Sequence, residues 1–212
     1  MTVHSFKPVP LPRRQLLAGA AALLAAPVFI RHALAQESRR LTPSQTEGPF
    51  YPVELPVDSD FDLLAQGSKR YTQGQAAWLD GTVTDRAGRP VQGAVVEIWQ
   101  CDQQGHYHHP GDRGADPAFQ GFGRVAVNSG GEYRFRTIRP SKYAGRTPHI
   151  HVKVKLAQRE LLTTQLYVAD EPDNERDGLW RRMSAADRAA ITVPFQADTD
   201  GLRARFAIVV AA

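Results

Sequence analysis

Apolar and polar residues alternate with a period of two along several short stretches of the chain. The clearest stretch is residues 131–138 (GEYRFRTI), in which Tyr133 and Phe135 fall on one face and charged residues on the other. This period is typical of a β-strand with one buried face. Similar stretches cover residues 78–85, 94–100, 149–156, 161–168 and 202–210, with Gly- and Pro-containing turns between several of them. The pattern predicts an all-β fold, an antiparallel β-sandwich.

The rest of the chain lacks this periodicity. Residues 36–60 are rich in Pro and polar residues. We therefore expect an irregular N-terminal arm over residues 36–77 and a β-sandwich with long loops over residues 78–212. Helix is expected only where Ser184 precedes AADRAA, because a serine in this place can cap a first turn. Residues 169–190 are otherwise acidic and then basic, which favours an excursion over the surface.

The first 35 residues have the composition of an export signal. Arg13 and Arg14 precede an apolar run over residues 16–30, and residues 33–35 form an A-x-A site. Such a segment indicates a cleaved signal, and the adjacent arginines favour the twin-arginine route. The alternative is a membrane anchor, but the run is short for a bilayer and Arg31 follows it directly. We expect a periplasmic or secreted protein with no membrane segment once residues 1–35 are removed.

Removing this signal changes the charge of the protein. The whole chain has 26 basic and 22 acidic residues and a formal net charge of +4. Four of the basic residues and none of the acidic ones lie in residues 1–35, so residues 36–212 are formally neutral. A neutral domain argues against nucleic acid as a partner. The single cysteine, Cys101, excludes an internal disulfide and a cysteine-based zinc site, and we expect it to be a small buried residue.

All histidines of residues 36–212 fall into two clusters, and each cluster contains a tyrosine. The first is GHYHH at residues 105–109, and the second lies in YAGRTPHIH at residues 143–151. His149 and His151 are two apart on a predicted strand, so both imidazoles project from the same face. Two imidazoles with phenols nearby can hold a transition metal, and phenolate oxygen favours a hard, oxidised ion such as Fe(III).

The segments around these clusters resemble the intradiol ring-cleavage dioxygenases, the family of protocatechuate 3,4-dioxygenase and the catechol 1,2-dioxygenases. The matching segments are TPSQTEGPFYP (42–52), DGTVTDRAGRPVQGAVVEIWQCDQQGHY (80–107), GEYRFRTIRPSKYAGRTPHIHVKV (131–154) and TTQLYV (163–168). Part of the second segment also occurs in non-catalytic prealbumin-like domains. The specific features are VEIWQ, the aligned tyrosine and RTPHIH in this order. The resemblance implies a catalytic domain with a prealbumin-like sandwich.

The resemblance implies one non-haem Fe(III) held by Tyr107, Tyr143, His149 and His151. The family cleaves catechol-type rings between the two hydroxyls with O2 and forms muconate-type diacids, so a small aromatic diol and O2 are the implied partners. By analogy, Tyr143 leaves the iron and takes a substrate proton, while Tyr107 stays bound. The loop between Tyr143 and His149 is shorter than in the best-known members, so protocatechuate, catechol, hydroxyquinol and substituted catechols all remain open.

The resemblance also assigns residues around the iron. Arg146 matches an arginine that stabilises negative charge as it develops, and Gln165 matches a glutamine near the iron. Trp99 takes the position of an active-site tryptophan, although a tryptophan on a sandwich strand is more often core. The arm residues that match a segment covering the substrate ring are Gly48, Pro49 and Phe50. In protocatechuate enzymes a neighbouring subunit can supply that segment, which points to a homo-oligomer.

The other three histidines are not expected to bind the metal. In an extended chain His106 and His108 point away from the face that Tyr107 uses. His109 shares that face, but Pro110 follows it and is expected to end the strand. We expect these histidines to face solvent or to contact the residues that hold the metal.

Two other classes of protein stay open at this point. One is a non-catalytic periplasmic binding module on the same sandwich, which predicts a colourless, iron-free protein. The other is a hydrolase or extradiol-type oxygenase that binds its metal through two histidines and a carboxylate. No Asp or Glu occurs between Glu132 and Glu160, so such a carboxylate would have to come from another strand.

Overall fold

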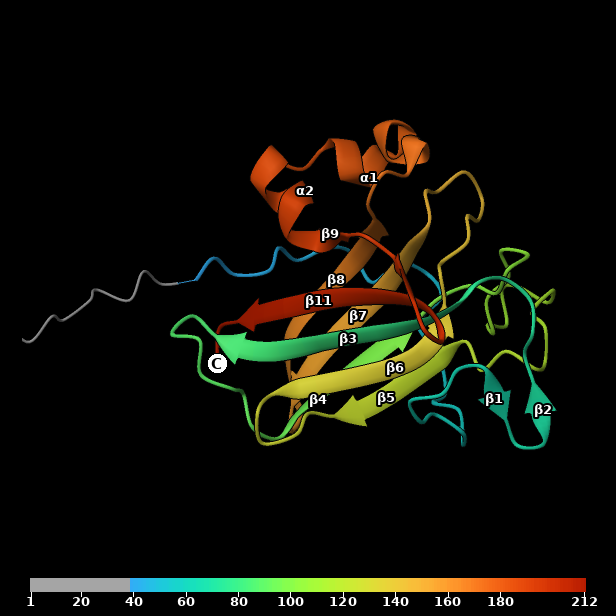
Figure 1. Cartoon of the computed structure of the whole chain (residues 1–212), viewed down its shortest axis with the longest axis horizontal. Helices are drawn as coiled ribbons and strands as arrows, with labels where there is room; N and C mark the ends of the chain where they lie inside the picture. Colours follow the sequence, from blue (N-terminus) through green and yellow to red (C-terminus); the bar gives the residue numbers. More distant parts are fainter. Residues whose placement is uncertain (1–38) are drawn as a thin grey trace, which may run out of the picture. The chain divides into compact units, whose positions relative to one another are not determined.

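The computed structural model describes residues 39–212. The predicted export signal, residues 1–35, lies outside the described residues and stays a prediction. Within residues 39–212, two main sheets carry the fold (Figure 1): a four-stranded sheet in the order β10-β11-β3-β6 and a five-stranded sheet in the order β5-β4-β7-β8-β9. The predicted all-β sandwich is confirmed.

The elements follow one another in a simple order along the chain. They are β1 (Ala65–Gln66), β2 (Lys69–Arg70), β3 (Ala76–Asp85), β4 (Ala94–Trp99), β5 (Phe122–Ala126), β6 (Glu132–Ile138), β7 (His149–Leu156), β8 (Arg159–Val168), the 3-10 segment η1 (Pro172–Arg176), α1 (Gly178–Arg181), α2 (Ala185–Ile191), β9 (Thr192–Val193), β10 (Gln196–Asp198) and β11 (Gly201–Val210). Most neighbouring strands are antiparallel, but β3 pairs with β11 and β8 with β9 in parallel. Alternation along one strand reports its buried face and not its partner, so the sequence could not show these two pairs.

The core lies between the two main sheets because the strands of each sheet turn their apolar residues toward the other sheet. On β7 the core side chains are Ile150, Val152 and Val154, all fully buried. Tyr133 and Phe135 of β6 belong to the same cluster, as their spacing predicted, with ring centroids 6.1 Å apart. The alternate residues of β7, among them the two histidines, therefore project from the outer face of the five-stranded sheet.

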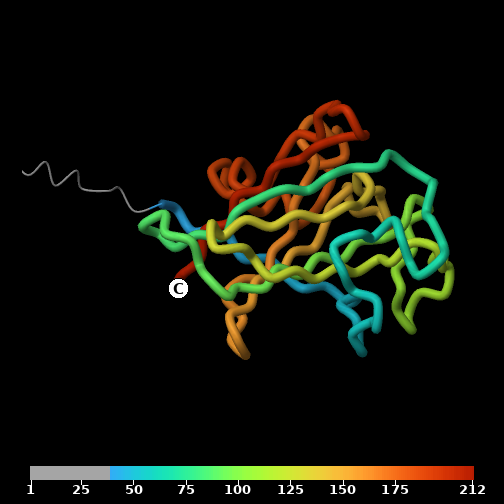
Figure 2. Tube along the Cα trace, turned by 60° about the horizontal axis from the view of Figure 1, so that its bottom comes forward, coloured from blue at the N-terminus to red at the C-terminus, as the bar shows by residue number. Residues whose placement is uncertain are grey.

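The N-terminal arm is tied to the sheets by backbone hydrogen bonds. The Thr42 amide donates to the Val209 carbonyl of β11 at 3.0 Å, and the Gln45 amide donates to the Thr163 carbonyl of β8 at 2.9 Å. Figure 2 shows this segment in blue as it passes along the strands before the chain enters β1 and β2. The arm thus brings residues 45–51 to the outer face of β7 and β8.

Residues 169–191 form the excursion that contains η1, α1 and α2 (Figure 1). The predicted cap is present, because the Ser184 hydroxyl oxygen accepts the Asp187 amide at 3.1 Å at the start of α2. Trp180, Met183 and Ala190 pack against the main core, so the excursion is more than a surface loop. No helix in residues 39–212 is long and apolar enough to cross a membrane.

Candidate metal centre and active site

His149 and His151 start β7 and share its outer face. The register of the sheet places Tyr167 of β8 opposite His149, and it places Gln165 of β8 and Trp99 of β4 on either side of His151. Side chains directly opposite each other in antiparallel strands are close neighbours. The strand pattern of the sequence thus brings five polar or aromatic side chains together in one part of the sheet.

The two imidazoles face each other through their Nε2 atoms, which are 3.3 Å apart. The Nδ1 of His149 lies 2.6 Å from the Thr147 carbonyl, which only accepts, so this nitrogen carries the proton and Nε2 keeps a lone pair. Two nitrogens bound to one metal ion at about 2.1 Å each lie about 3.0–3.4 Å apart. The pair therefore has the separation and, in His149, the tautomer of two metal ligands.

Tyr107 comes from the loop between β4 and β5, and this loop holds it firmly. The Asp112 carboxylate accepts the backbone amide of Tyr107 at 2.9 Å and lies 2.9 Å from the His106 ring. The Asp102 carboxylate accepts the His106 amide at 2.9 Å. The Tyr107 residue is 2% exposed, and its phenol oxygen is buried without a hydrogen-bond partner in residues 39–212. A buried unpaired hydroxyl is costly and points to a missing partner.

Tyr143 opens a tight turn that ends at Arg146. The Arg146 amide donates to the Tyr143 carbonyl at 2.7 Å, and both central residues have positive φ, 43° at Ala144 and 77° at Gly145. Such a conformation is strained for alanine and easy for glycine. The turn fixes Tyr143 and Arg146 relative to each other at the entrance to β7.

The rings of these two tyrosines and two histidines converge. The ring centroids are 5.0 Å apart for Tyr107 and Tyr143, 5.6 Å for Tyr143 and His149, and 6.1 Å for Tyr107 and His151. Neutral imidazoles and phenol oxygens are suitable donors for a ferric ion. The unpaired Tyr107 oxygen and the facing Nε2 atoms show that these residues fit a bound metal.

The protonation of the site supports the same conclusion. Burial, and then the charge of Arg146, lower the pKa of His149 to about 4, against the effect of the Thr147 carbonyl. Burial lowers the pKa of His151 well below its ordinary value, and His149 and Arg146 lower it further. Both imidazoles are neutral at pH 7, the form that binds metals. Burial raises the pKa of Tyr107 well above its ordinary value, so a phenolate forms here only beside a strong cation.

Arg146 links the turn to the neighbouring strand. Its Nη2 donates to the Gln165 Oε1 at 2.8 Å and lies 3.3 Å from the Tyr167 hydroxyl. The Gln165 Nε2 in turn donates to the Thr46 carbonyl of the arm at 3.0 Å. Arg146 and Gln165, the two residues that the family resemblance assigns around the iron, thus lie together beside the histidines.

Asp177 is a site residue that the sequence did not reveal. Its carboxylate is fully buried and accepts the Arg146 Nε at 2.6 Å. Asp177 comes from the excursion, directly before α1, where an aspartate signals a helix start. That signal predicts a cap; it does not predict a contact with a turn 31 residues away.

The arm covers the site from the other side. The Phe50 ring stacks on Tyr107 with centroids 4.6 Å apart and lies edge-on to Tyr143 at 5.6 Å. Gly48 has a φ of 74°, and a Cβ there would lie 3.2 Å from the His151 ring. Pro49 between them is exposed. A side chain at position 48 would press on His151, so this glycine permits both the turn and the close approach.

Trp99 and Cys101 line the base of the site. The Trp99 ring stacks on His151 with centroids 4.8 Å apart and an interplanar angle of 10°. Trp99 therefore lies at the site as well as in the apolar cluster with Cys101 and Tyr107. Cys101 is fully buried, as expected, and burial raises the pKa of its thiol to about 12. Its thiol is inert at neutral pH.

The remaining histidines hold the loop and do not meet His149 or His151. His106 pairs with Asp112 as described, and His108 is exposed, with its Nε2 3.1 Å from the Asp116 carbonyl oxygen. His109 accepts the Gly111 amide at 3.0 Å and lies edge-on to Phe50 at 5.5 Å. His109 is thus a histidine of the GHYHH cluster that contacts Phe50, the arm residue stacked on Tyr107.

The part of the chain that the structure describes shows no carboxylate-based metal site. In residues 39–212 no group of three or more His, Cys, Asp or Glu side chains could hold a metal ion. The donor set that the structure brings together contains tyrosines instead.

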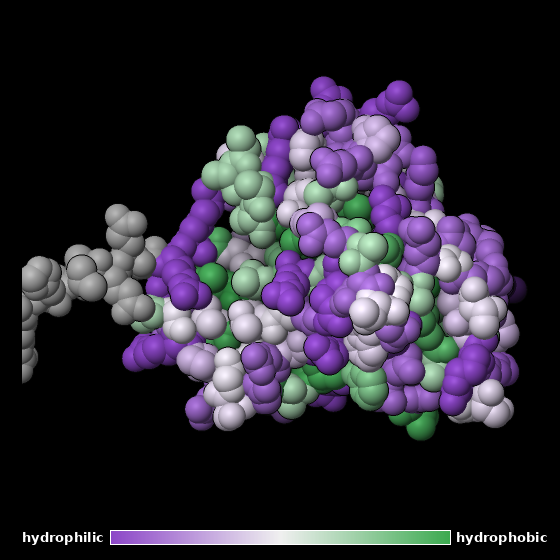
Figure 3. All heavy atoms as spheres, in the orientation of Figure 1, coloured by the Kyte–Doolittle hydropathy of each residue, from purple (hydrophilic) through white to green (hydrophobic). Residues whose placement is uncertain are grey.

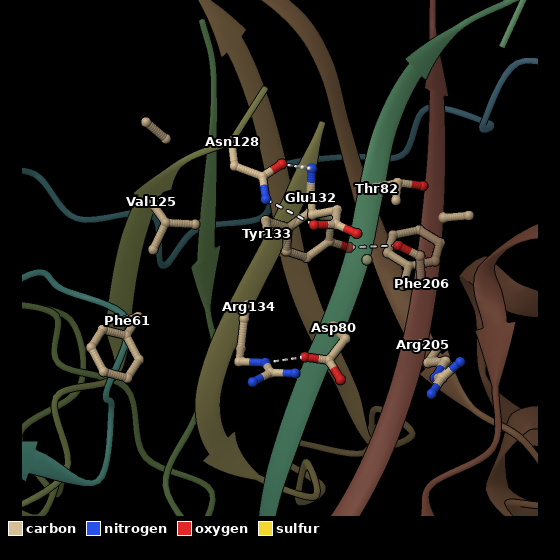
Figure 4. A pocket seen from close by; sticks show the side chains of 13 residues that line it. Phe61, Asp80, Thr82, Val125, Asn128, Glu132, Tyr133, Arg134, Arg205 and Phe206 are labelled. Carbon is tan, nitrogen blue, oxygen red and sulfur yellow. Dashed lines mark hydrogen bonds and ion pairs between the residues drawn. The ribbon is translucent and has the colours of Figure 1, made fainter. Parts of the chain in front are cut away.

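A cavity of about 880 Å³ lies away from these residues, against the four-stranded sheet (Figure 4). Some of its polar side chains are already paired: Asp80 accepts from Arg134 at 2.6 Å, and the Tyr133 hydroxyl donates to the Phe206 carbonyl at 2.7 Å. Hydrophilic side chains dominate the face seen in Figure 3. Size alone does not make this cavity a reaction site.

The residues of this site also fall within the part of the chain that matches a known protein family. A family model described as Dioxygenase matches residues 46–211. The chain belongs to the intradiol ring-cleavage dioxygenases. The match begins at Thr46 in the arm and so includes the tyrosines, the histidines, Arg146, Gln165 and Asp177.

Curated relatives in this dioxygenase family are named for different substrates. The chain is 32% identical to a hydroxyquinol 1,2-dioxygenase of Corynebacterium glutamicum over 146 residues, which are 60% of this chain and 46% of that protein. It is 32% identical to the protocatechuate 3,4-dioxygenase beta chain of Burkholderia cepacia over 165 residues, 71% of this chain and 69% of that one. The chain spans about half the length of the hydroxyquinol and catechol dioxygenases that it matches.

Solved structures agree with the fold. The dioxygenase domain of a dioxygenase carbohydrate-binding protein fusion from Streptomyces sp. SirexAA-E superposes with a TM-score of 0.63 and 32% identity, covering 80% of this chain and 97% of that one. Nearly the whole of that domain thus corresponds to residues of this dioxygenase-family chain.

Proposed function

We propose that this chain binds one non-haem Fe(III) through Tyr107, Tyr143, His149 and His151 and cleaves catechol-type rings between the two hydroxyls with O2, giving muconate-type diacids. The observation that carries the proposal is the convergence of two phenols and two imidazoles, with the histidine Nε2 atoms 3.3 Å apart. When bound, ferric iron supplies Lewis acidity that polarises and orients the catechol oxygens.

The two tyrosines have different surroundings and so suit different roles. Tyr107 is 2% exposed and held by the backbone of its loop, whereas Tyr143 is partly exposed at the edge of the site. Tyr143 therefore suits the role of the phenol oxygen that moves and takes a proton from an incoming diol. Tyr107 suits the role of a fixed ligand.

Arg146 supplies positive charge on the open side of the ligands. Its side chain is 20% exposed and hydrogen-bonds both Gln165 and Asp177. A guanidinium held in this way stabilises negative charge that develops on a reacting ring, without having to reorganise. Gln165, opposite His151, accepts from the Arg146 Nη2 and so holds the outer end of the guanidinium.

The substrate class follows from the family and from the aromatic lining. The relatives are named for hydroxyquinol, catechol and protocatechuate, and these share a benzene ring with two adjacent hydroxyls. Phe50 and Trp99 present flat rings beside the ligands, and such rings favour a planar aromatic partner. We therefore propose a 1,2-benzenediol as the substrate class and leave the ring substituents open.

The visible absorption spectrum of purified residues 36–212, loaded with iron, tests this proposal. We expect a broad tyrosinate-to-iron charge-transfer band that shifts when catechol is added under nitrogen. Admission of air should then consume the catechol and release a diacid. A protein that stays colourless after iron loading would refute the iron site and favour the binding module on the same sandwich.

A further inference from the structure

The buried carboxylate of Asp177 receives four hydrogen bonds. Its Oδ1 accepts the amides of Leu179 at 2.9 Å and Trp180 at 3.0 Å, and its Oδ2 accepts the Arg146 Nε at 2.6 Å and the Thr147 amide at 3.2 Å. A carboxylate has about four lone-pair sites, so this group is saturated. One oxygen serves the excursion, and the other serves the turn before β7.

The second oxygen determines how Arg146 lies. A guanidinium is planar, so fixing two of its nitrogens fixes the direction of all its N–H groups. Asp177 holds Nε, and Gln165 holds Nη2 at 2.8 Å. The same Nη2 also lies 3.3 Å from the Tyr167 hydroxyl. With Nε released, the long side chain would keep only its far-end contacts and could rotate about them.

The same contact balances charge. The Asp177 side chain is fully buried and that of Arg146 is 20% exposed, so neither ion is well solvated. A buried charge that loses its partner is strongly disfavoured. The pair therefore keeps the guanidinium at the site in its folded position instead of letting it turn out to solvent.

We propose that Asp177 is a positioning residue of the active site: it aims the Arg146 guanidinium at Gln165 and Tyr167 from the excursion that carries η1, α1 and α2. This inference rests on the proposed function. It adds the excursion to the active site. The Asp177 carboxylate hydrogen-bonds none of the four ligand residues and no residue of the arm; it acts through Arg146.

A purely structural role for Asp177 is the rival explanation, because the residue also caps α1. Asp177→Asn separates the two roles. Asparagine is as good a cap as aspartate, but it has one acceptor oxygen. When that oxygen caps α1, its amide NH2 faces the N–H groups of Arg146 and Thr147. Asp177→Ser is the second variant, since serine also caps but carries no charge.

Ser184→Ala is the matched control. It removes the cap of α2 in the same excursion, where the hydroxyl oxygen accepts the Asp187 amide at 3.1 Å, and it leaves Arg146 untouched. Any loss of activity that comes only from loosening the excursion should appear in this variant as well. The thermal midpoints of all three variants show how far each one is loosened.

The experiment measures kcat and KM for catechol with iron-loaded wild type and variants, together with the visible band. We expect Asp177→Asn and Asp177→Ser to lower kcat about 10–100-fold, as loss of an orienting partner does, with KM changed less than about threefold. The band, its shift with catechol under nitrogen, and iron content should be unchanged. In an Arg146→Ala background, Asp177→Asn should cause no further loss of kcat, because the two residues act as one unit.

Three results would overturn the inference. A kcat in both Asp177 variants within twofold of Ser184→Ala would leave Asp177 as a cap only. An equal loss of kcat in the wild-type and Arg146→Ala backgrounds would show that Asp177 does not act through Arg146. A colourless and inactive iron-loaded wild type would overturn the proposed function and this inference together, which distinguishes that failure from the other two.

Discussion

Two groups of polar residues lie on the same outer face of the five-stranded sheet, two residues apart along its strands. At one level Trp99 is opposite His151, and at the next Glu97 is opposite Lys153. We call the second group the ionic cluster; its members are Glu47, Tyr51, Glu97, Lys153, Lys155 and Glu160. The arm covers both groups, with Phe50 over the metal centre and Tyr51 over the ionic cluster.

The groups differ in how their polar atoms are satisfied. In the ionic cluster the fully buried Glu97 accepts from Tyr51 at 2.8 Å and pairs with Lys155 at 3.0 Å, while Lys153 pairs with Glu47 and Glu160. At the candidate metal centre the Tyr107 oxygen, which faces the proposed ligands, has no partner in residues 39–212, and neither do the His151 Nδ1 and the Trp99 Nε1. Buried polar groups are normally paired. The group with the unpaired phenol oxygen is thus the one that suits a bound partner, whereas the ionic cluster suits a purely structural role.

The largest expected effect comes from Tyr107→Phe, which removes the unpaired oxygen. We expect loss of most of the visible band and a fall in kcat of about 1,000-fold or more, since metal catalysis contributes several kcal/mol. Absorbance at equal protein concentration measures the band, the iron content shows how much metal is bound, and turnover of catechol measures kcat. Tyr133→Phe is the control, a buried tyrosine whose hydroxyl bonds the Phe206 carbonyl far from the ligands. Full colour and activity in Tyr107→Phe would remove Tyr107 from the centre.

Arg146→Ala should have the next largest effect. We expect the protein to keep its iron and band while kcat falls about 100–1,000-fold, the usual cost of removing a donor that stabilises developing charge. Single-turnover decay of the anaerobic catechol complex after mixing with O2 isolates this step. Arg139→Ala is the matched control, because Arg139 lies in the same loop as Arg146, between β6 and β7. This variant breaks the ion pair of Arg139 with Glu171. An unchanged rate would reduce Arg146 to a structural role.

The contrast between the groups is sharpest in Glu97→Gln. Removing this charge leaves Lys155 and Arg124 without their buried partner, so we expect a loss of about 2 kcal/mol, below the full cost of breaking a buried pair because both cations are partly solvated. The thermal midpoint should fall by about 4–8 °C, while kcat per bound iron changes less than threefold. Glu132→Gln on an exposed position of β6 is the control. If Glu97→Gln lost its visible band but kept its thermal midpoint, the separation between the ionic cluster and the metal centre would be contradicted.

The smallest effect concerns pH and Glu160. The Thr163 hydroxyl bond and the Lys153 contact lower the pKa of Glu160 below 4.5 against the effect of burial. Its ionised form therefore stabilises the fold above about pH 4.5, and this contribution disappears as pH falls through the lowered pKa. Glu160 is half exposed, so the amount is below about 1 kcal/mol. Urea unfolding at pH 6 and pH 3 should show a smaller loss in Glu160→Gln than in wild type; equal losses would contradict it.

The sequence predicted best what a single strand determines. The period of two in residues 149–156 placed His149 and His151 on one face, and the structure has them there. The neighbours on β4 and β8 also follow a regular alternation, so their cross-strand contacts needed only the correct register. The family resemblance supplied the two tyrosines, which come from loops without any periodic pattern.

Contacts made by irregular segments could not be predicted in the same way. Asp177 reaches Arg146 across 31 residues, and Glu47 reaches Lys153 across 106. Nothing in local composition tells which loop will fold back onto which strand. The strand β5 was also missed, since FGRVA is short and only its first two residues are buried.

The place of β11 has a consequence for how the protein folds. The last strand of the chain lies between β10 and β3, and it pairs with β3 across more than a hundred residues of sequence, from Leu202 opposite Ala77 to Val210 opposite Asp85. The arm then bonds to Val209 of this strand. Contacts between such distant residues close late and slow folding. The arm thus docks on a strand whose pairing with β3 closes late, and we expect the arm residues that cover the proposed ligands to become ordered late as well.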